Sequence, residues 1–423
     1  MLKNILILFI FKIYLSNIII PFYRQNLNLK PSKINFDLLE FFQYQKIFIN
    51  LNIGNSSITS TFNINNSEVL IFNYEPSYNS SLLINDKNYI TTDTLKGYKI
   101  EDNIILETKK EKIFLNNVPL IKVKEFLINN EDKNTNNNAI IGLKNNDLNL
   151  LNNLKNKNII NLNLFSFIYK NDNEGDLLLG SYPHESGYNY KKENLFVFKG
   201  YNSKNWVFSF DSIKVGNFEI GYSHEIDFTM TPIIIAPRVY RKKIKELFFK
   251  KLFNESKCFK EKKYDEIEEM YTEHYYYCDI NQKIDYSEFP SIKFGFNNPK
   301  ITFELTYKDL FKEINGKNYL TVILKKYDDE QWVLGDIFLK KYTLVFDNDK
   351  KEIAYYIKKE SINIIKQINP WIIVFIFSSF ISIILICWIR NVFFGPKRAI
   401  PSSFEYNINQ SNSESNYQKI DIN

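Results

Sequence analysis

Few residues of this chain are of a type and spacing that could do chemistry. His184, His224 and His274 are far apart with no metal-ligand spacing, and no glycine-rich phosphate loop occurs, so we expect neither a metal nor another cofactor. The formal charge of +6 over 423 residues is modest and spread out, so we expect no nucleic-acid partner.

The elements that would position such a residue are short strands with glycines between them. In Gln331-Trp332-Val333-Leu334-Gly335, an apolar pair leads into a glycine, and a short amphipathic turn and a returning strand that ends at Asp347 follow. This order predicts a buried backbone crossing. Ala139-Ile140-Ile141-Gly142-Leu143 repeats the pattern in the first half of the chain, which indicates an internal duplication. Short runs rich in Ile, Phe, Tyr and Val between Asn, Asp and Gly turns predict a mostly β protein.

Taken in order, these segments resemble landmarks of the pepsin-family aspartic proteases (peptidase A1), and the membrane-anchored, plasmepsin-like members in particular. Leu51-Asn52-Ile53-Gly54 is similar to the first strand and its turn, Gly175-Asp176-Leu177-Leu178-Leu179-Gly180 to the hairpin that ends the first lobe, and Asn205-Trp206 to the start of the second. The resemblance implies a bilobal, mostly β fold with an N-terminal lobe at 21–192 and a C-terminal lobe at 193–360.

The same resemblance identifies the catalytic positions, and both are degenerate. The family uses two aspartates, one from each lobe, which share a proton. The first aspartate maps to Asn63, in a stretch with no aspartate between Gly54 and Asp86. In the second lobe, counting back from Pro237 without a gap places Phe228 at the aspartate, whereas a one-residue insertion places Asp227 there. We therefore expect no intact catalytic pair, with Asp227 as the residual carboxylate.

Both ends of the chain carry apolar segments that predict targeting and anchoring. Residues 1–20 suit a signal peptide or signal anchor. Residues 371–389 contain no charge, have tryptophans near both ends and are long enough to span a bilayer as a helix. A linker at 361–370 would precede this helix and a cytosolic tail at 390–423 would follow it. The prediction is a single-pass type I membrane protein of the secretory pathway or cell surface.

Cysteine usage and function follow from the resemblance. Cys258 and Cys278 resemble the disulfide of the family's C-terminal lobe, and an oxidising lumen permits the bond. The expected function is that of a catalytically inactive pseudoprotease that binds a protein or peptide partner through the former substrate cleft. Two alternatives stay open: an active, membrane-bound aspartic endopeptidase that uses Asp227, and a structural or adhesive surface protein whose cleft is filled by Phe228 and Met230.

Overall fold

The structure is a computed structural model, and two compact units divide the chain, residues 1–358 and 359–423. Of the second unit only three residues are described. The described residues are 17–24, 46–64, 66, 68–72, 89–91, 95–126, 139–144, 149–199, 206–220, 224–265, 270–297, 300–324, 331–357, 382, 385 and 386.

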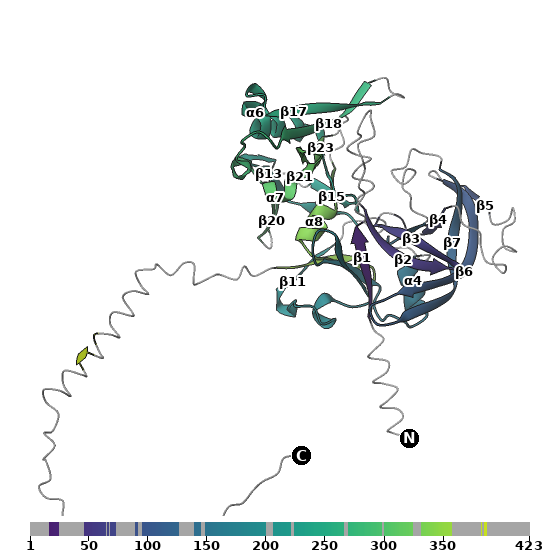
Figure 1. Ribbon diagram of the computed structural model, residues 1–423. Helices are drawn as coiled ribbons and strands as arrows, with labels where there is room; N and C mark the ends of the chain where they lie inside the picture. The colour runs from purple at the N-terminus through teal and green to yellow at the C-terminus, as the bar shows by residue number, and fades with distance from the viewer. Residues whose placement is uncertain are drawn as a thin grey trace, which may run out of the picture. The chain divides into compact units, whose positions relative to one another are not determined.

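The described residues of the first half form β strands, one short α helix and two short 3-10 helices (Figure 1). The elements are β1 (Ile18–Arg24), β2 (Ile47–Ile53), β3 (Ser56–Asn63), β4 (Val69–Ile71), β5 (Tyr89–Thr91), β6 (Leu95–Glu107), β7 (Lys112–Phe126), β8 (Ala139–Gly142), α4 (Leu150–Asn156), β9 (Leu164–Tyr169), β10 (Glu174–Leu179), η2 (Pro183–Glu185) and η3 (Lys192–Asn194). Figure 1 shows β2, β3, β6 and β7 lying beside one another in this half.

The second half adds further strands and three consecutive helical segments. The elements are β11 (Leu195–Lys199), β12 (Phe208–Phe210), β13 (Ser212–Val215), β14 (Phe218–Ile220), β15 (His224–Phe228), β16 (Ile234–Ala236), α5 (Arg238–Ile244), η4 (Lys245–Phe249), α6 (Lys250–Asn254), β17 (Cys258–Asp265), β18 (Met270–Asp279), η5 (Tyr286–Glu288), β19 (Ile292–Phe296), β20 (Ile301–Leu305), α7 (Tyr307–Leu310), β21 (Phe311–Ile314), β22 (Lys317–Leu320), β23 (Val322–Leu324), β24 (Trp332–Leu334), α8 (Asp336–Lys341), β25 (Leu344–Asp347) and β26 (Glu352–Tyr356).

The strands form three sheets, and the largest joins the two halves of the chain. Its thirteen strands run β11-β26-β25-β9-β10-β1-β2-β3-β8-β4-β7-β6-β5. The C-terminal hairpin β25–β26 therefore pairs with β9 from the first half, and Phe165 stacks on Phe346 at 4.8 Å between ring centroids. A nine-stranded sheet contains β15, β16 and β24, and a four-stranded sheet runs β14-β13-β19-β20. The mostly β fold expected from the sequence is confirmed.

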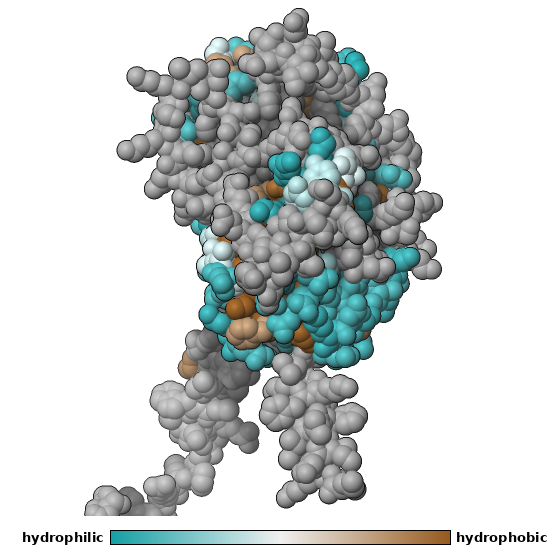
Figure 2. All heavy atoms as spheres, turned by 90° about the vertical axis from the view of Figure 1, so that its right-hand side faces the viewer, coloured by the Kyte–Doolittle hydropathy of each residue, from teal (hydrophilic) through white to brown (hydrophobic). Residues whose placement is uncertain are grey.

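Strand β6 shows why such sequences form half-buried sheets. Its side chains alternate between the core and the surface, with Ile100, Ile104 and Leu106 buried and Glu101 and Asn103 exposed. Figure 2, which views the molecule from the right-hand side of Figure 1, shows a largely hydrophilic surface among its coloured residues. One face of the sheet therefore packs inward and the other meets water.

The internal duplication predicted from the two glycine-centred segments is present in the strand order. In the first half, β8 runs parallel to β3 and antiparallel to β4. In the second half, β24 runs parallel to β15 and antiparallel to β16. Each repeat thus inserts its apolar-apolar strand between two strands that are consecutive in its half.

The terminal predictions fall mostly outside the described residues. No helix among the described residues is long and apolar enough to cross a membrane. Of the predicted span 371–389, only residues 382, 385 and 386 are described, and the segments 361–370 and 390–423 are not described. At the N-terminus, Ile18 and Ile20 are buried in β1, so the predicted signal boundary at residue 20 falls inside a strand of the large sheet.

Gly335 has no room for a side chain, as the predicted crossing requires. A Cβ atom there would lie 1.9 Å from the Ile233 carbonyl oxygen and 2.1 Å from that of Thr231. We expect Gly335→Ala to destabilise the fold by at least about 3 kcal/mol, because backbone rather than side-chain atoms would have to move. Urea unfolding followed by tryptophan fluorescence measures this.

A matched control is Gly295→Ala, in a strand of the four-stranded sheet. There the nearest atom to an added Cβ is the Ser212 hydroxyl oxygen at 3.0 Å, which can rotate away. We expect a change of about 1 kcal/mol or less. Equal effects of the two substitutions would contradict the tight crossing at Gly335.

Candidate functional site

In each repeat, the strand that leads into the predicted catalytic loop runs beside the strand that precedes the crossing glycine. Strand β3 ends at Asn63, which is paired with Gly142 of β8. In the second repeat, Phe228 at the end of β15 is paired with Leu334 of β24, so Thr229 is the residue that continues beside Gly335. By this register Thr229 matches Asn63. Counting back from β16, where Ile234 is paired with Leu334 as Val69 of β4 is with Ile141, matches Phe228 to it instead. The gapless count in the sequence places Phe228 there, one residue earlier.

The side-chain amide of Asn63 stabilises the turn that follows β3. Its Oδ1 accepts a hydrogen bond from the backbone N–H of Asn66 at 3.2 Å, and its backbone carbonyl accepts one from Leu143 at 2.9 Å. A carboxylate oxygen at this position could accept the same bond. An amide, however, has no basic oxygen or nitrogen near neutral pH.

Thr229 occupies the corresponding turn in the second repeat. Its backbone N–H donates to the Leu334 carbonyl at 3.0 Å, and its hydroxyl oxygen accepts from the backbone N–H of Thr231 at 3.3 Å. The hydroxyl is also 3.2 Å from that of the buried Thr231. A small side chain with one oxygen acceptor therefore closes the turn, as Asn63 does in the first repeat.

Phe228 and Asp227 point to opposite sides of β15, as neighbours in a strand do. Phe228 is fully buried and meets the ring of Phe346 edge to face at 5.6 Å. Asp227 is half-buried, and its Oδ1 accepts a hydrogen bond from the backbone N–H of Phe228 at 2.8 Å. The aromatic ring belongs to the hydrophobic core, and Asp227 is the carboxylate nearest in sequence to this loop end.

A buried ion pair lies directly behind the Gly335 crossing. Asp336 begins α8, and its backbone N–H donates to the Thr231 carbonyl at 3.1 Å. Its side chain is 1 % exposed and pairs with the guanidinium of Arg24, at the end of β1. The Tyr169 hydroxyl lies 3.4 Å from the same carboxylate oxygen. Sequence analysis missed this pair because its members are 312 positions apart, and the segment around Gly335 and Asp336 gives no sign of a partner in the first strand.

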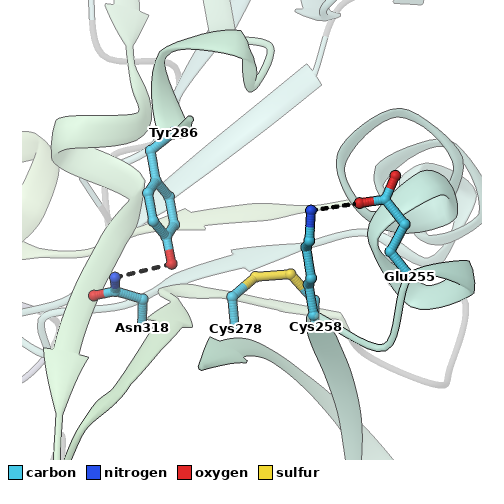
Figure 3. The surroundings of a disulfide bond; sticks show 6 residues. Glu255, Cys258, Cys278, Tyr286 and Asn318 are labelled. Carbon is cyan, nitrogen blue, oxygen red and sulfur yellow. Dashed lines mark hydrogen bonds and ion pairs between the residues drawn. A yellow bond between two sulfur atoms is a disulfide. The ribbon is translucent and has the colours of Figure 1, made fainter. Parts of the chain in front are cut away.

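The predicted disulfide is confirmed. Cys258 of β17 and Cys278 of β18 are bonded, and both are buried (Figure 3). The two residues face each other across the antiparallel pair of strands, with a Cα–Cα separation of 3.9 Å. Near the bond, the Asn318 amide donates to the Tyr286 hydroxyl at 2.9 Å. The disulfide therefore ties the long hairpin β17–β18 at its base, close to α6.

A model of the eukaryotic aspartyl protease family matches residues 58–355, which covers both repeats and both loop ends. A search of curated proteins found no match to the chain.

Removing Arg24 tests the importance of the buried ion pair. We expect Arg24→Met to lower the free energy of unfolding by about 3–5 kcal/mol, because Asp336 would stay buried without its cation. Urea unfolding at neutral pH measures the loss.

The control is Lys112→Met, which breaks the exposed pair between Lys112 and Glu107 at 3.0 Å. An exposed pair of this kind contributes at most about 1 kcal/mol. A similar small effect for Arg24→Met would show that the buried pair does not hold β1 in place.

Proposed function

This chain belongs to the eukaryotic aspartyl protease family, and we propose that it is a catalytically inactive, membrane-anchored pseudoprotease that binds a protein or peptide partner through the former substrate cleft. The observation that carries the proposal is the pair of side chains at the corresponding loop ends, Asn63 and Thr229.

The loss of activity follows from the chemistry of those two side chains. Peptide hydrolysis by this family needs one carboxylate to activate water and a second that shares its proton. Asn63 supplies an amide and Thr229 a hydroxyl, and neither takes up a proton near neutral pH. Asp227 is a single carboxylate whose Oδ1 is already engaged by the Phe228 backbone N–H. One carboxylate without its partner does not form the shared-proton pair.

The retained framework supports a binding role. The structure keeps both three-strand repeats, the crossing at Gly335 and the strands that join the two halves. The loop ends, however, lack the aspartates that catalysis would need. In a bilobal framework, the strands around the former catalytic loops can contact an extended peptide. Partner binding is the function that would use such contacts without hydrolysis.

Membrane anchoring and a secretory route are supported by the two ends of the sequence. Residues 371–389 form an uncharged apolar stretch between Pro370 and Arg390, and the N-terminal twenty positions are largely apolar. The disulfide between Cys258 and Cys278 agrees with a lumenal location. Because Ile18 and Ile20 are buried in β1, a cleavage site before residue 18 fits the fold better than one after residue 20.

The alternative is an active, plasmepsin-like aspartic endopeptidase of the secretory pathway. Its supporting observation is that Asp227 is half-buried beside the second loop end, where a carboxylate could contact a substrate. The partner group would then have to be something other than a second aspartate at position 63.

Peptide-library cleavage separates the two functions. We expect the full chain in detergent to cleave no peptide between roughly pH 4 and 7.5, the range over which a carboxylate pair would act. The double substitution Asn63→Asp with Thr229→Asp should restore pepstatin-sensitive cleavage at the acid end, because it supplies both carboxylates at the corresponding positions. Peptide binding by the unsubstituted chain is measured in parallel by fluorescence anisotropy.

The Asp227→Ala variant is the control for the alternative. Pepstatin-sensitive cleavage by the unsubstituted chain that disappears in this variant would establish an active protease. A folded chain that neither cleaves nor binds any peptide of the library would overturn the proposed binding role of the cleft.

A further inference from the structure

A pocket lies beside the Gly335 crossing, around the buried pair of Arg24 and Asp336. Its volume is about 410 Å³, which is within the range of small-molecule sites. Neither Asn63 nor Thr229 lines it. Its walls come from the end of β1, the β9–β10 turn, α7, β21 and α8, and its charged lining residues are Arg24, Asp172, Lys308, Asp309, Lys312, Asp336, Lys340 and Lys341.

The lining has more positive than negative charge. Five side chains are basic and three are acidic. Each carboxylate already contacts a different cation: Asp336 contacts Arg24, Asp172 contacts Lys340, and Asp309 contacts Lys341 at 2.6 Å. The carboxylates therefore do not neutralise the lining, and its net charge favours an anion.

Arg24 also has a donor that is not used. Its side chain is 9 % exposed, and its Nε atom is buried with no hydrogen-bond partner within the described part of the chain. A buried donor without an acceptor is costly, so such groups commonly mark a missing partner. An anion that accepts from this N–H would satisfy the guanidinium while Asp336 keeps its own contact.

Lys312 is placed to respond to such an anion. Burial and, next in importance, the positive charge of Arg24 lower the pKa of Lys312 to about 8. The other charges that act on this amine are Asp336 and Lys340 of α8 and Asp172 of the β9–β10 turn. A bound anion would stabilise the ammonium form and offset this electrostatic cost.

We propose that this pocket binds a phosphoryl group, carried by a small phosphomonoester or by a phospholipid headgroup. A phosphoryl dianion matches the excess positive charge and offers several acceptor oxygens to Arg24 and the surrounding ammonium groups. The apolar part of the lining, Pro232, Phe311 and Ile337, is available to the body of the ligand. This site does not depend on the chain's proposed lack of catalysis.

Calorimetric titration of the full chain with glycerol 3-phosphate tests the proposal. We expect saturable binding that Lys312→Met weakens about tenfold, as the loss of one charged contact would. Lys283→Met is the matched control, because Lys283 is exposed and lies outside the pocket lining, and it should leave the affinity unchanged. Affinity should also fall between pH 7 and 9 as Lys312 loses its proton near its pKa of about 8, since a phosphomonoester with a second pKa of about 6 stays dianionic throughout.

A second measurement uses the unsubstituted protein, in case the Lys312 variant does not fold. Reductive methylation mapped by mass spectrometry should modify Lys312 readily, and glycerol 3-phosphate should protect it while Lys283 stays reactive. Absence of saturable binding, or equal binding by the two variants together with no protection of Lys312, would overturn the proposal.

Dihexanoyl phosphatidic acid, used below its micelle concentration, distinguishes the two sources of the phosphoryl group. Binding at least tenfold tighter than glycerol 3-phosphate would assign the site to a lipid headgroup. Equal or weaker binding would assign it to a soluble phosphomonoester. Binding of neither compound would count against the site itself.

Discussion

The close approach of two backbone segments at Gly335 is the constraint on which the second lobe depends. Only glycine leaves space beside the carbonyls of Thr231 and Ile233, so β24 can lie between β15 and β16. The same approach brings the Asp336 N–H to the Thr231 carbonyl and buries the Asp336 side chain at the start of α8. A buried carboxylate needs a cation, and Arg24 of β1 supplies it. One steric requirement thus leads to a contact between the N-terminal strand and the second lobe.

The framework of the fold and the chemistry of its loops are separable in this chain. The repeats require apolar strands and a tight crossing, and both are kept. At the loop ends the turn needs an acceptor for a backbone N–H, which Asn63 and Thr229 provide through an amide oxygen and a hydroxyl oxygen. Carboxylates could make these hydrogen bonds too, but only carboxylates could also hold the shared proton. The turns are therefore supported without a carboxylate at either position.

A cluster of charged side chains lies around Arg24 and Asp336. The carboxylate of Asp336 and the guanidinium of Arg24 lie together in a pocket whose lining is net positive. In the same pocket, the pKa of Lys312 is lower than that of an exposed lysine. The loop ends carry neutral side chains at both corresponding positions. If the chain has kept a site that recognises charge, the Arg24 pocket has the groups for it, whereas the loop ends are suited to shape and backbone contacts.

The amino-acid sequence alone determined the features that depend on local pattern. Apolar pairs before Gly142 and Gly335 predicted the duplicated crossing, and strand-rich composition predicted the β fold. The pairing of Cys258 with Cys278 and the loss of the first aspartate at Asn63 followed from the resemblance to the pepsin family. The β fold, the duplicated crossing and the disulfide are confirmed, whereas the loss of the first aspartate stays a prediction. The strands and the crossing could be predicted because steric and hydrophobic requirements act over a few neighbouring residues.

Tertiary structure alone decided which distant residues meet. It placed Phe228 opposite Leu334 in the core, because the register of β15 against β24 is set by hydrogen bonds between strands far apart in the chain. It also drew Ile18 and Ile20 into a sheet and brought Arg24 to Asp336. No local pattern encodes such contacts, since they arise only when the whole core packs and a buried charge must find its partner.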